Sequence, residues 1–321
     1  MQNIITRTPL RITLAGGGSD MPFFYKRSPG AAVNATIDKY MYIVVHRAFG
    51  NTYRIRYSKE EDAKSIGDIE HGPVREALRL LDIKPGIEIV SLSDIPTKGS
   101  GLGSSSAYLV GLLHALHIWK GQLVSKEQLA REAVTIERDR LGEHSGLQDP
   151  YAVALGGLNL YEYMPDERVK VNPIIMNSED LNALQSNLML LYTDIRKKSN
   201  AVLESVWKMD NFETLAARRD MAFRYYDELT SGNWKRTGHI ISEGSWMKHG
   251  AGQKSGGSEI ETICRKIAAL GGDVRSIGSG DSGFLLIFAN EQKQKAIKEE
   301  LKLPELKFGF EFNGSSVILF N

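Results

Sequence analysis

Apolar and polar positions alternate at the start of the chain and then change to the spacing of helices. Residues 4–14 alternate with the period of a strand and end in a run of glycines. Apolar residues recur three or four positions apart over residues 74–81, 105–119 and 126–138, as in helices packed on a core. Further strands are expected at residues 31–46, 53–57, 87–92 and 156–173.

The second half repeats both patterns after a polar segment at residues 177–182. Helices are expected at residues 199–207, 212–229, 234–247 and 258–270, and strands at residues 188–192, 274–277, 284–288 and 316–320. These strands are expected to form a second mixed layer with the helices, so the pattern predicts the α+β class. The polar segment predicts a boundary between one domain at residues 1–177 and another at residues 178–321.

Composition narrows the classes of partner. The 40 Lys and Arg residues against 39 Asp and Glu residues leave a formal charge of +1, which gives no reason to expect nucleic acid or an anionic membrane as partner. The most apolar run, residues 108–119, is too short to span a bilayer. The single cysteine, Cys264, fits a reducing compartment. We therefore expect a cytoplasmic protein without a membrane segment, and the sequence leaves a homodimer open.

A loop rich in glycine and serine leads into the apolar run of residues 105–119. Glycine lets the backbone approach an anion, and the N–H groups and dipole of the following helix attract it. We expect this loop to bind the phosphates of a nucleotide, although such a run alone is equally compatible with a turn that caps a helix. The residues expected to bind are Pro96, Gly99, Gly101, Leu102, Gly103, Ser104, Ser105 and Ser106.

Glycine-rich segments occur at residues 16–20, 99–106 and 278–283, and the middle one includes Gly-Leu-Gly-Ser-Ser-Ser-Ala over residues 101–107. In this order they resemble the GHMP kinases, the family of galactokinase, homoserine kinase, mevalonate kinase and phosphomevalonate kinase, over essentially the whole chain. The resemblance implies a two-lobed α+β fold, with a mixed β/α nucleotide lobe followed by a ferredoxin-like lobe. It also implies ATP and Mg²⁺ as cofactors.

Within the family, residues 8–20 are most similar to the sugar 1-kinases, in particular the heptose 7-phosphate kinases and the fucokinase domain. The resemblance implies that Arg11 faces the phosphoryl acceptor and that Asp149 acts as base or orients the acceptor hydroxyl. From the residues alone, Asp149 is also suited to cap a helix ahead of Pro150. The resemblance further implies that Ser105 and Glu137 share the magnesium ion.

Two groups of residues are expected to bind the sugar. The resemblance implies that the first glycine segment contacts its hydroxyls, with Asp20 as the hydrogen-bonding acid. A cationic cluster follows the strand at residues 188–192 and is expected to bind the distal phosphate of a phosphosugar. A solvated charged turn is the alternative for this cluster. The expected substrate-binding residues are Gly17, Gly18, Ser19, Asp20, Arg196 and Lys197.

The implied reaction transfers the γ-phosphate of ATP to the anomeric hydroxyl of D-glycero-D-manno-heptose 7-phosphate and gives the 1,7-bisphosphate, a precursor of activated heptose for surface polysaccharide. Another sugar 1-kinase, such as an L-fucose kinase, is the first alternative. The second is a non-catalytic nucleotide-binding protein with the same fold, which Asp281 in the third glycine segment favours because an acid there would repel phosphates. The presence of Arg11, Ser105, Glu137 and Asp149 together argues against it.

Two histidines, His114 and His117, lie three positions apart in the helix expected at residues 105–119. That spacing is compatible with a metal ion, but no third ligand is evident in the surrounding sequence. We therefore expect both to be packing residues.

Overall fold

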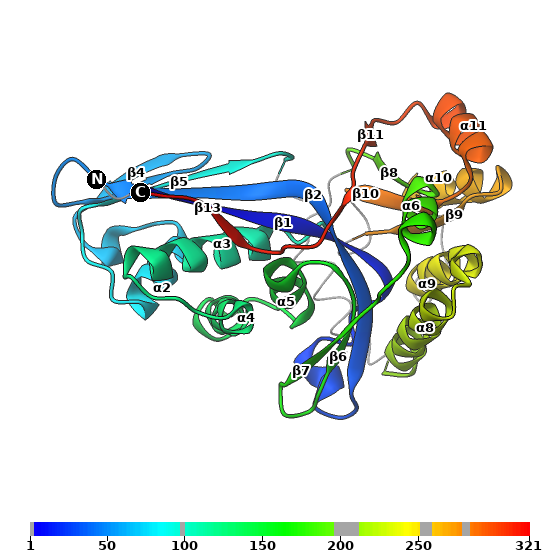
Figure 1. Cartoon of the computed structure of the whole chain (residues 1–321), viewed down its shortest axis with the longest axis horizontal. Coiled ribbons are helices and arrows are strands. Elements are labelled where there is room, and N and C mark those ends of the chain that lie inside the picture. Colours follow the sequence, from blue (N-terminus) through cyan, green and yellow to red (C-terminus); the bar gives the residue numbers. More distant parts are fainter. Residues whose placement is uncertain (1–2, 97–99, 196–211, 251–258, 278–282) are drawn as a thin grey trace.

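A long antiparallel pair of strands forms the centre of the large sheet. The computed structural model describes residues 3–96, 100–195, 212–250, 259–277 and 283–321. Strand β1 (Asn3–Gly16) pairs with β2 (Gly30–Arg47) from Asn3 opposite His46 to Gly16 opposite Ala32. The register shifts after Pro9 and again after Thr13, and such irregularities bend a strand and increase its twist. Figure 1 shows this bent pair extending from the end of the molecule that holds both termini to its middle.

Strand β2 has different neighbours at its two ends. Its C-terminal half pairs with β5 (Ile87–Ser93), and its N-terminal half pairs with β6 (Leu158–Tyr163). The large sheet has the order β13-β1-β2-β5-β3-β4, with β6, β7 and β12 attached beside this path. The remaining strands are β3 (Tyr53–Arg56), β4 (Glu60–Ala63), β7 (Val169–Pro173), β12 (Phe310–Glu311) and β13 (Ser316–Phe320).

Helices cover one face of this sheet (Figure 1). They are α2 (Gly72–Leu80), α3 (Ser104–Trp119), α4 (Lys126–Val134) and α5 (Gln148–Leu155), with a π-helical turn at Thr135–Arg140. Helix α3 is apolar almost all round and largely buried, as expected for a helix surrounded by other elements. Its position at the centre of this layer fixes the loop that precedes it. A short helix, α1 (Pro22–Tyr25), follows the first glycine segment, and 3₁₀ turns occur at Ile66–Asp68 and Trp234–Arg236.

A second sheet of four antiparallel strands has the order β11-β8-β10-β9. Its strands are β8 (Leu188–Tyr192), β9 (Asp273–Ser276), β10 (Phe284–Phe288) and β11 (Glu305–Leu306). Helices separate β8 from β9 and β10 from β11, which gives the chain order and strand arrangement of a ferredoxin-like unit. The expected α+β fold with two sheets, including a ferredoxin-like second lobe, is therefore confirmed.

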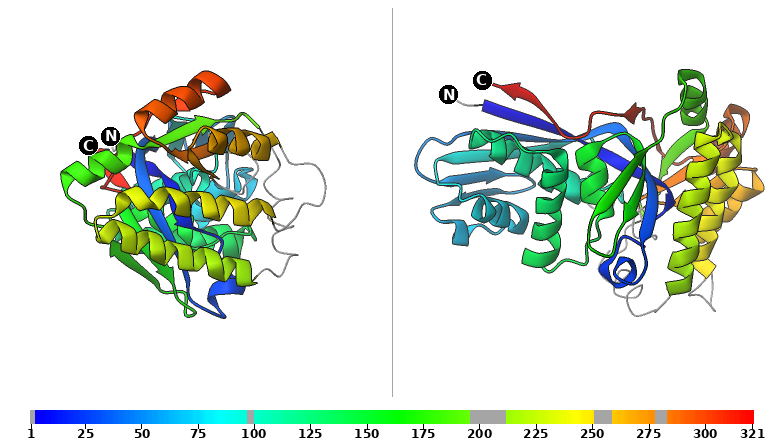
Figure 2. Two further views of the ribbon diagram at one scale, coloured as in Figure 1. Left: turned by 90° about the vertical axis from the view of Figure 1, so that its right-hand side faces the viewer. Right: turned by 60° about the horizontal axis from the view of Figure 1, so that its bottom comes forward.

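The helices of the second half form two groups. Helices α8 (Phe212–Thr230) and α9 (Thr237–Gly250) lie side by side (Figures 1 and 2) and share one hydrophobic core with the large sheet and with one face of the second sheet. Helices α10 (Glu259–Ala269) and α11 (Glu291–Leu301) cover the other face, around a separate core that contains Cys264. Helix α8 is therefore placed against β1 and β2, where the first glycine segment begins.

Two expectations about elements need correction, and one helix was missed. The strand at residues 316–320 exists, but it pairs with β1 in the large sheet rather than completing the second layer. The polar segment at residues 177–182 begins helix α6 (Ser178–Ser186), because the Asn177 side chain accepts a hydrogen bond from the Asp180 backbone N–H and caps it. Helix α11 was not expected at all.

The structure tests neither the expected domain boundary nor one of the expected helices. The domain boundary at residue 177 stays a prediction. Strands β12 and β13, which belong to the second expected domain, pair with strands of the large sheet. The helix expected at residues 199–207 lies outside the described residues. Among the helices that the structure describes, none is long and apolar enough to cross a membrane.

Candidate active site

The loop before α3 is shaped by two glycines in the left-handed region. Gly101 has φ of +70° and Gly103 has φ of +74°, and Gly103 is the N-cap residue of α3. Glycine adopts these angles without strain but provides no side chain to cap the helix. The first backbone N–H groups of α3 therefore have no side-chain cap, which is the arrangement that binds anions. The hydroxyls of Ser100 and Ser104 hydrogen-bond to each other at 2.8 Å and close the loop.

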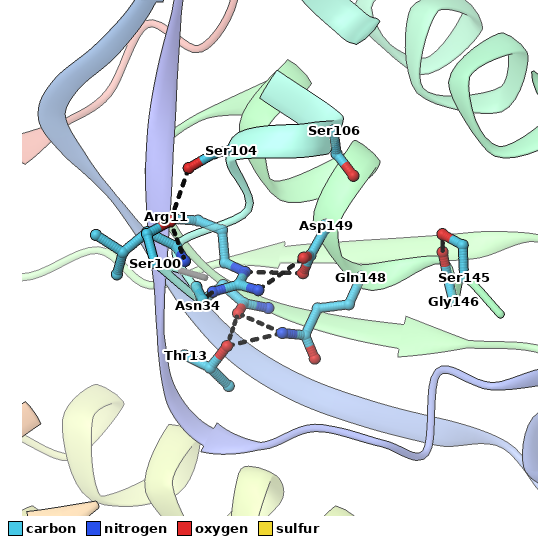
Figure 3. Close-up of polar contacts among 12 residues, drawn as sticks. Arg11, Thr13, Asn34, Ser100, Ser104, Ser106, Ser145, Gly146, Gln148 and Asp149 are labelled. Atoms are coloured by element: carbon cyan, nitrogen blue, oxygen red, sulfur yellow. Dashed lines mark hydrogen bonds and ion pairs between the residues drawn. The ribbon is translucent and has the colours of Figure 1, made fainter. Parts of the chain in front are cut away.

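Arg11 joins this loop to helix α5. Its Nε donates to Asp149 Oδ1 at 2.8 Å and its Nη2 donates to Asp149 Oδ2 at 2.7 Å, so the ion pair is bidentate (Figure 3). Its Nη1 donates to the Gly101 carbonyl at 2.5 Å, and its backbone N–H donates to the Leu102 carbonyl at 2.9 Å. The Arg11 side chain is 5% exposed, whereas that of Asp149 is 33% exposed. A fixed cation thus holds a carboxylate that solvent and ligands can still reach.

Asp149 lies in the first turn of α5 but does not cap it. The N-cap residue is Leu147, without a side-chain hydrogen bond, and both Asp149 oxygens face Arg11. The helix-capping interpretation is therefore wrong. Arg11 and Asp149, 138 positions apart in the sequence, meet as the resemblance implied.

Asp20 is buried behind this pair. Its Oδ1 accepts from the Gly18 N–H at 3.0 Å and its Oδ2 from the Gln148 N–H at 3.3 Å, so it connects the first glycine segment to α5. Burial and the nearby negative charge of Asp149 raise the pKa of Asp20. Asp20 therefore lies near Asp149 and near any ligand that Asp149 would bind. However, Asp20 is only 8% exposed, and its carboxylate already accepts two backbone hydrogen bonds.

The other residues of the first glycine segment differ in accessibility. Gly16, Gly17 and Gly18 have φ of +77°, +91° and +87°, so the backbone turns sharply there. Ser19 is fully buried, and its hydroxyl accepts from the Ala31 N–H and donates to the Ala31 carbonyl. The Ser19 hydroxyl therefore holds the turn against β2, and a contact of Ser19 with the sugar stays a prediction.

Glu137 lies in the π-helical turn and is almost completely buried. Its Oε1 accepts from Ser106 Oγ at 2.9 Å and its Oε2 from Ser145 Oγ at 2.6 Å. Burial raises the pKa of Glu137 to about 7, since the two serine hydrogen bonds offset only part of the desolvation. Ser105 is exposed, so the structure brings Glu137 to Ser106 and not to the serine that the resemblance implied.

The donor chemistry around Glu137 fits a magnesium ion. A carboxylate and serine hydroxyls are hard oxygen donors, and a bound cation would relieve the cost of burying the Glu137 charge. In the described parts of the chain, no group of three or more His, Cys, Asp or Glu residues could hold a metal ion. An ion here would therefore take few protein ligands, as magnesium does beside nucleotide phosphates.

The sequence did not reveal a buried polar network below Asp149. Gln148 Nε2 donates to Thr13 Oγ1 at 2.7 Å and to Asn34 Oδ1 at 3.1 Å, and Thr13 Oγ1 donates to the same Asn34 oxygen at 2.9 Å (Figure 3). Gln148 Oε1 and Asn34 Nδ2 are buried and have no hydrogen-bond partner in the described structure. The available signal was the presence of the polar residues Thr13 and Asn34 at inward positions of two largely buried strands.

Some expected site residues cannot be compared with the structure. Gly99, Arg196, Lys197 and Asp281 lie outside the described residues. Pro96 is described and exposed, at the start of the nucleotide loop.

Comparison with known proteins agrees with this geometry. Residues 47–157 match the model of the GHMP kinases N-terminal domain. The chain is 27% identical to D-glycero-alpha-D-manno-heptose 7-phosphate kinase of Campylobacter jejuni, over 94% of each chain. It is 22% identical to L-fucokinase/L-fucose-1-P guanylyltransferase of Bacteroides fragilis, over 94% of this chain and 37% of that protein.

Solved structures show the same fold. A D-glycero-D-manno-heptose 1-phosphate kinase from Bacteroides thetaiotaomicron superposes with a TM-score of 0.80 at 23% identity, over 98% of both chains. Lactococcus lactis galactokinase, in complex with galactose, superposes with a TM-score of 0.73 at 16% identity, over 98% of this chain and 94% of that one.

The matched family model and these relatives identify the class of protein as an ATP-dependent sugar kinase. The chain belongs to the GHMP kinase family.

Proposed function

We propose that this enzyme transfers the γ-phosphate of ATP to the anomeric hydroxyl of D-glycero-D-manno-heptose 7-phosphate and forms the 1,7-bisphosphate. The observation that carries the proposal is the bidentate Arg11–Asp149 pair beside the uncapped N-terminus of α3. The likeness to the Campylobacter jejuni enzyme over 94% of both chains supports the choice of sugar. The product would enter the synthesis of activated heptose.

In this proposal, Asp149 acts on the acceptor hydroxyl. Each of its oxygens accepts one hydrogen bond from Arg11, which leaves lone pairs on the exposed side to accept the hydroxyl proton. An anomeric hydroxyl is more acidic than an ordinary alcohol, so a carboxylate is a sufficient base. Arg11 keeps the carboxylate in one orientation and adds positive charge near the transferred group.

The nucleotide lies on the other side of Arg11 in this arrangement. The N–H groups at the start of α3 bind its phosphates, and the backbone of Gly101 and Leu102 links this cradle to Arg11. Glu137, with Ser105 or Ser106, would hold Mg²⁺. That ion would neutralise part of the negative charge on the nucleotide phosphates.

The test measures ADP release with MgATP and a panel of acceptors: D-glycero-D-manno-heptose 7-phosphate, sedoheptulose 7-phosphate, mannose 6-phosphate, mannose, galactose and L-fucose. We expect turnover with the heptose phosphate, with a product phosphorylated at C1 in ³¹P NMR spectra. Asp149→Asn should lower kcat by about 10²- to 10⁴-fold and leave ATP binding intact. Asp139→Asn, an exposed acid paired with Arg138, is the matched control and should be fully active.

The other outcomes select the alternatives. Turnover restricted to L-fucose or another free sugar would replace the heptose phosphate by that sugar. ATP binding without turnover on any acceptor would favour a non-catalytic nucleotide-binding protein. Full activity of Asp149→Asn would exclude Asp149 as the group that acts on the hydroxyl.

A further inference from the structure

Two arginines from the second half of the chain reach the first glycine segment. Arg275, on β9, donates from Nη1 to the Leu14 carbonyl at 2.9 Å and from Nη2 to the Gly16 carbonyl at 3.2 Å. Arg218, on α8, donates from Nη2 to the same Gly16 carbonyl at 3.4 Å. Because the two guanidinium groups share one acceptor, two positive charges lie side by side.

Neither cation forms an ion pair with a carboxylate in the part of the chain that the structure describes. Arg275 is 5% exposed, and the Nε atoms of Arg218 and Arg275 are buried without a hydrogen-bond partner. Desolvation lowers the pKa of both arginines, and the charge of Arg218 contributes to the lowering of Arg275 to about 9. Arg275 is buried and Arg218 is partly buried, and the nearby charge of Asp20 offsets only part of the desolvation of Arg218, so this position attracts an anion.

Arg218 also lies next to the acceptor side of the active site. A Cβ atom built on Gly18 would be 3.4 Å from Arg218 Nη1, and one built on Gly17 would be 3.6 Å from Arg218 Nη2. The Gly17 position would also be 3.4 Å from Gln148 Oε1, and Gln148 directly precedes Asp149. Because Gly17 and Gly18 have no side chains, this segment places none over the Arg218 guanidinium. The guanidinium therefore lies close to Gln148, the residue before Asp149.

We propose that Arg218, with Arg275 behind it, binds a phosphate group that the acceptor carries away from its reacting hydroxyl. This inference rests on the proposed function and makes the acceptor a phosphorylated sugar. A phosphate monoester carries about two negative charges at neutral pH, which two guanidinium groups can balance. The planar fork of Arg218 also suits bidentate binding of phosphate oxygens. Arg275 acts as a positioning residue, since both its Nη atoms are bound to the glycine segment.

The test compares Arg218→Ala with Arg219→Ala. Arg219 is the next residue of α8 and pairs with Asp220 and Ser28 away from the glycine segment, so it is a matched control. Arg218→Ala should raise KM for D-glycero-D-manno-heptose 7-phosphate by about 10- to 100-fold, because charge-assisted hydrogen bonds are lost. KM for ATP should change less than about 2-fold, and the variant should lose the preference for heptose 7-phosphate over unphosphorylated heptose.

A binding measurement separates this inference from the proposed function. With saturating AMP-PNP in the nucleotide site, inorganic phosphate should raise the Tm of the wild type and of Arg219→Ala but not that of Arg218→Ala. If the wild type shows this shift but does not phosphorylate the heptose phosphate, the proposed substrate is wrong and the anion subsite stands. Arg218→Lys, which keeps the charge, covers the case in which the alanine variant does not fold, and it should show an intermediate KM.

Three results would overturn the inference. The first is an unchanged KM for the sugar phosphate in Arg218→Ala, and the second is an equal loss with phosphorylated and unphosphorylated heptose. The third is an effect confined to KM for ATP, which would place Arg218 at the nucleotide instead.

Discussion

Two histidines on consecutive turns of α3 should give the folding stability opposite dependences on pH. His114 is partly buried, and its Nδ1 lies 3.0 Å from Ser315 Oγ. Burial, with the positive charges of Lys126 and His117 nearby, lowers the pKa of His114 from its usual 6.5 to about 4. His117 is 3% exposed and its Nε2 lies 2.7 Å from Glu132 Oε2, and although burial opposes protonation, this contact raises its pKa.

The sign of each effect follows from which state binds more protons. Between about pH 6.5 and 4, the unfolded chain protonates His114 and the folded chain does not, so stability falls as the pH falls through this range. The two pKa values correspond to a loss of about 2 kcal/mol by pH 5 and about 3 kcal/mol at pH 4 and below. For His117 the folded state binds the proton more tightly. Its contribution is therefore complete below about pH 6.5 and is lost as the pH rises through the higher folded pKa.

The assay is urea unfolding followed by tryptophan fluorescence at several values between pH 5 and 8. His114→Asn retains a polar atom near the position of Nδ1 but does not titrate in this range. The stability of the wild type relative to this variant should decrease by about 2 kcal/mol between pH 7.5 and pH 5. The variant His117→Gln should show a difference of the opposite sign. A constant difference between the wild type and His114→Asn would show that His114 is not held neutral, and the reasoning from burial would fail.

The remaining predictions concern the glycine segment and the candidate metal site. Gly16 has φ of +77°, and a Cβ atom built on it would lie 2.6 Å from the Ala31 carbonyl oxygen. Gly16→Ala should therefore reduce the free energy of unfolding by more than about 2 kcal/mol. The control is Gly121→Ala, with φ of +70° and no heavy atom within 4 Å of the new Cβ, which should reduce it by about 1 kcal/mol. Glu137→Gln should raise the Mg²⁺ concentration needed for half-maximal activity by about 10-fold or more, measured at saturating ATP, and Glu143→Gln should not; equal magnesium curves for the wild type and Glu137→Gln would remove Glu137 from the metal site.

The sequence was most informative where backbone geometry requires particular residues. The glycines at positions 101 and 103, followed by an apolar run, indicated a sharp turn into a helix, and both glycines have left-handed φ because few other residues adopt this backbone. The meeting of Arg11 with Asp149 followed from the resemblance, which relates positions 138 residues apart. No local pattern could have shown that contact.

Sequence reasoning failed where an element has little apolar periodicity or an unknown partner. Helix α11 buries only Ile297 completely and is otherwise rich in Lys, Glu and Gln, so its pattern resembles that of a solvated segment. The apolar residues of β13 predicted a strand but could not specify β1 as its neighbour, because the choice of partner strand depends on the path of the whole chain. Helix α8 contains several arginines, and the sequence alone does not show that Arg218 faces inward.

The two serines at the start of α3 differ in what their side chains reach. Consecutive residues of a helix point about 100° apart, so the hydroxyls of Ser105 and Ser106 face different directions. In this structure Ser106 reaches Glu137 and Ser105 is exposed at the helix N-terminus, beside the uncapped N–H groups. Among the described residues, the site therefore holds a buried acid at Glu137 and cations at Arg218 and Arg275, none of them in an ion pair, around a neutral Arg11–Asp149 pair. Such a charge distribution is complementary to a reaction that brings a metal-bound nucleotide and an anionic acceptor together, because each ligand would neutralise the protein charge that it contacts.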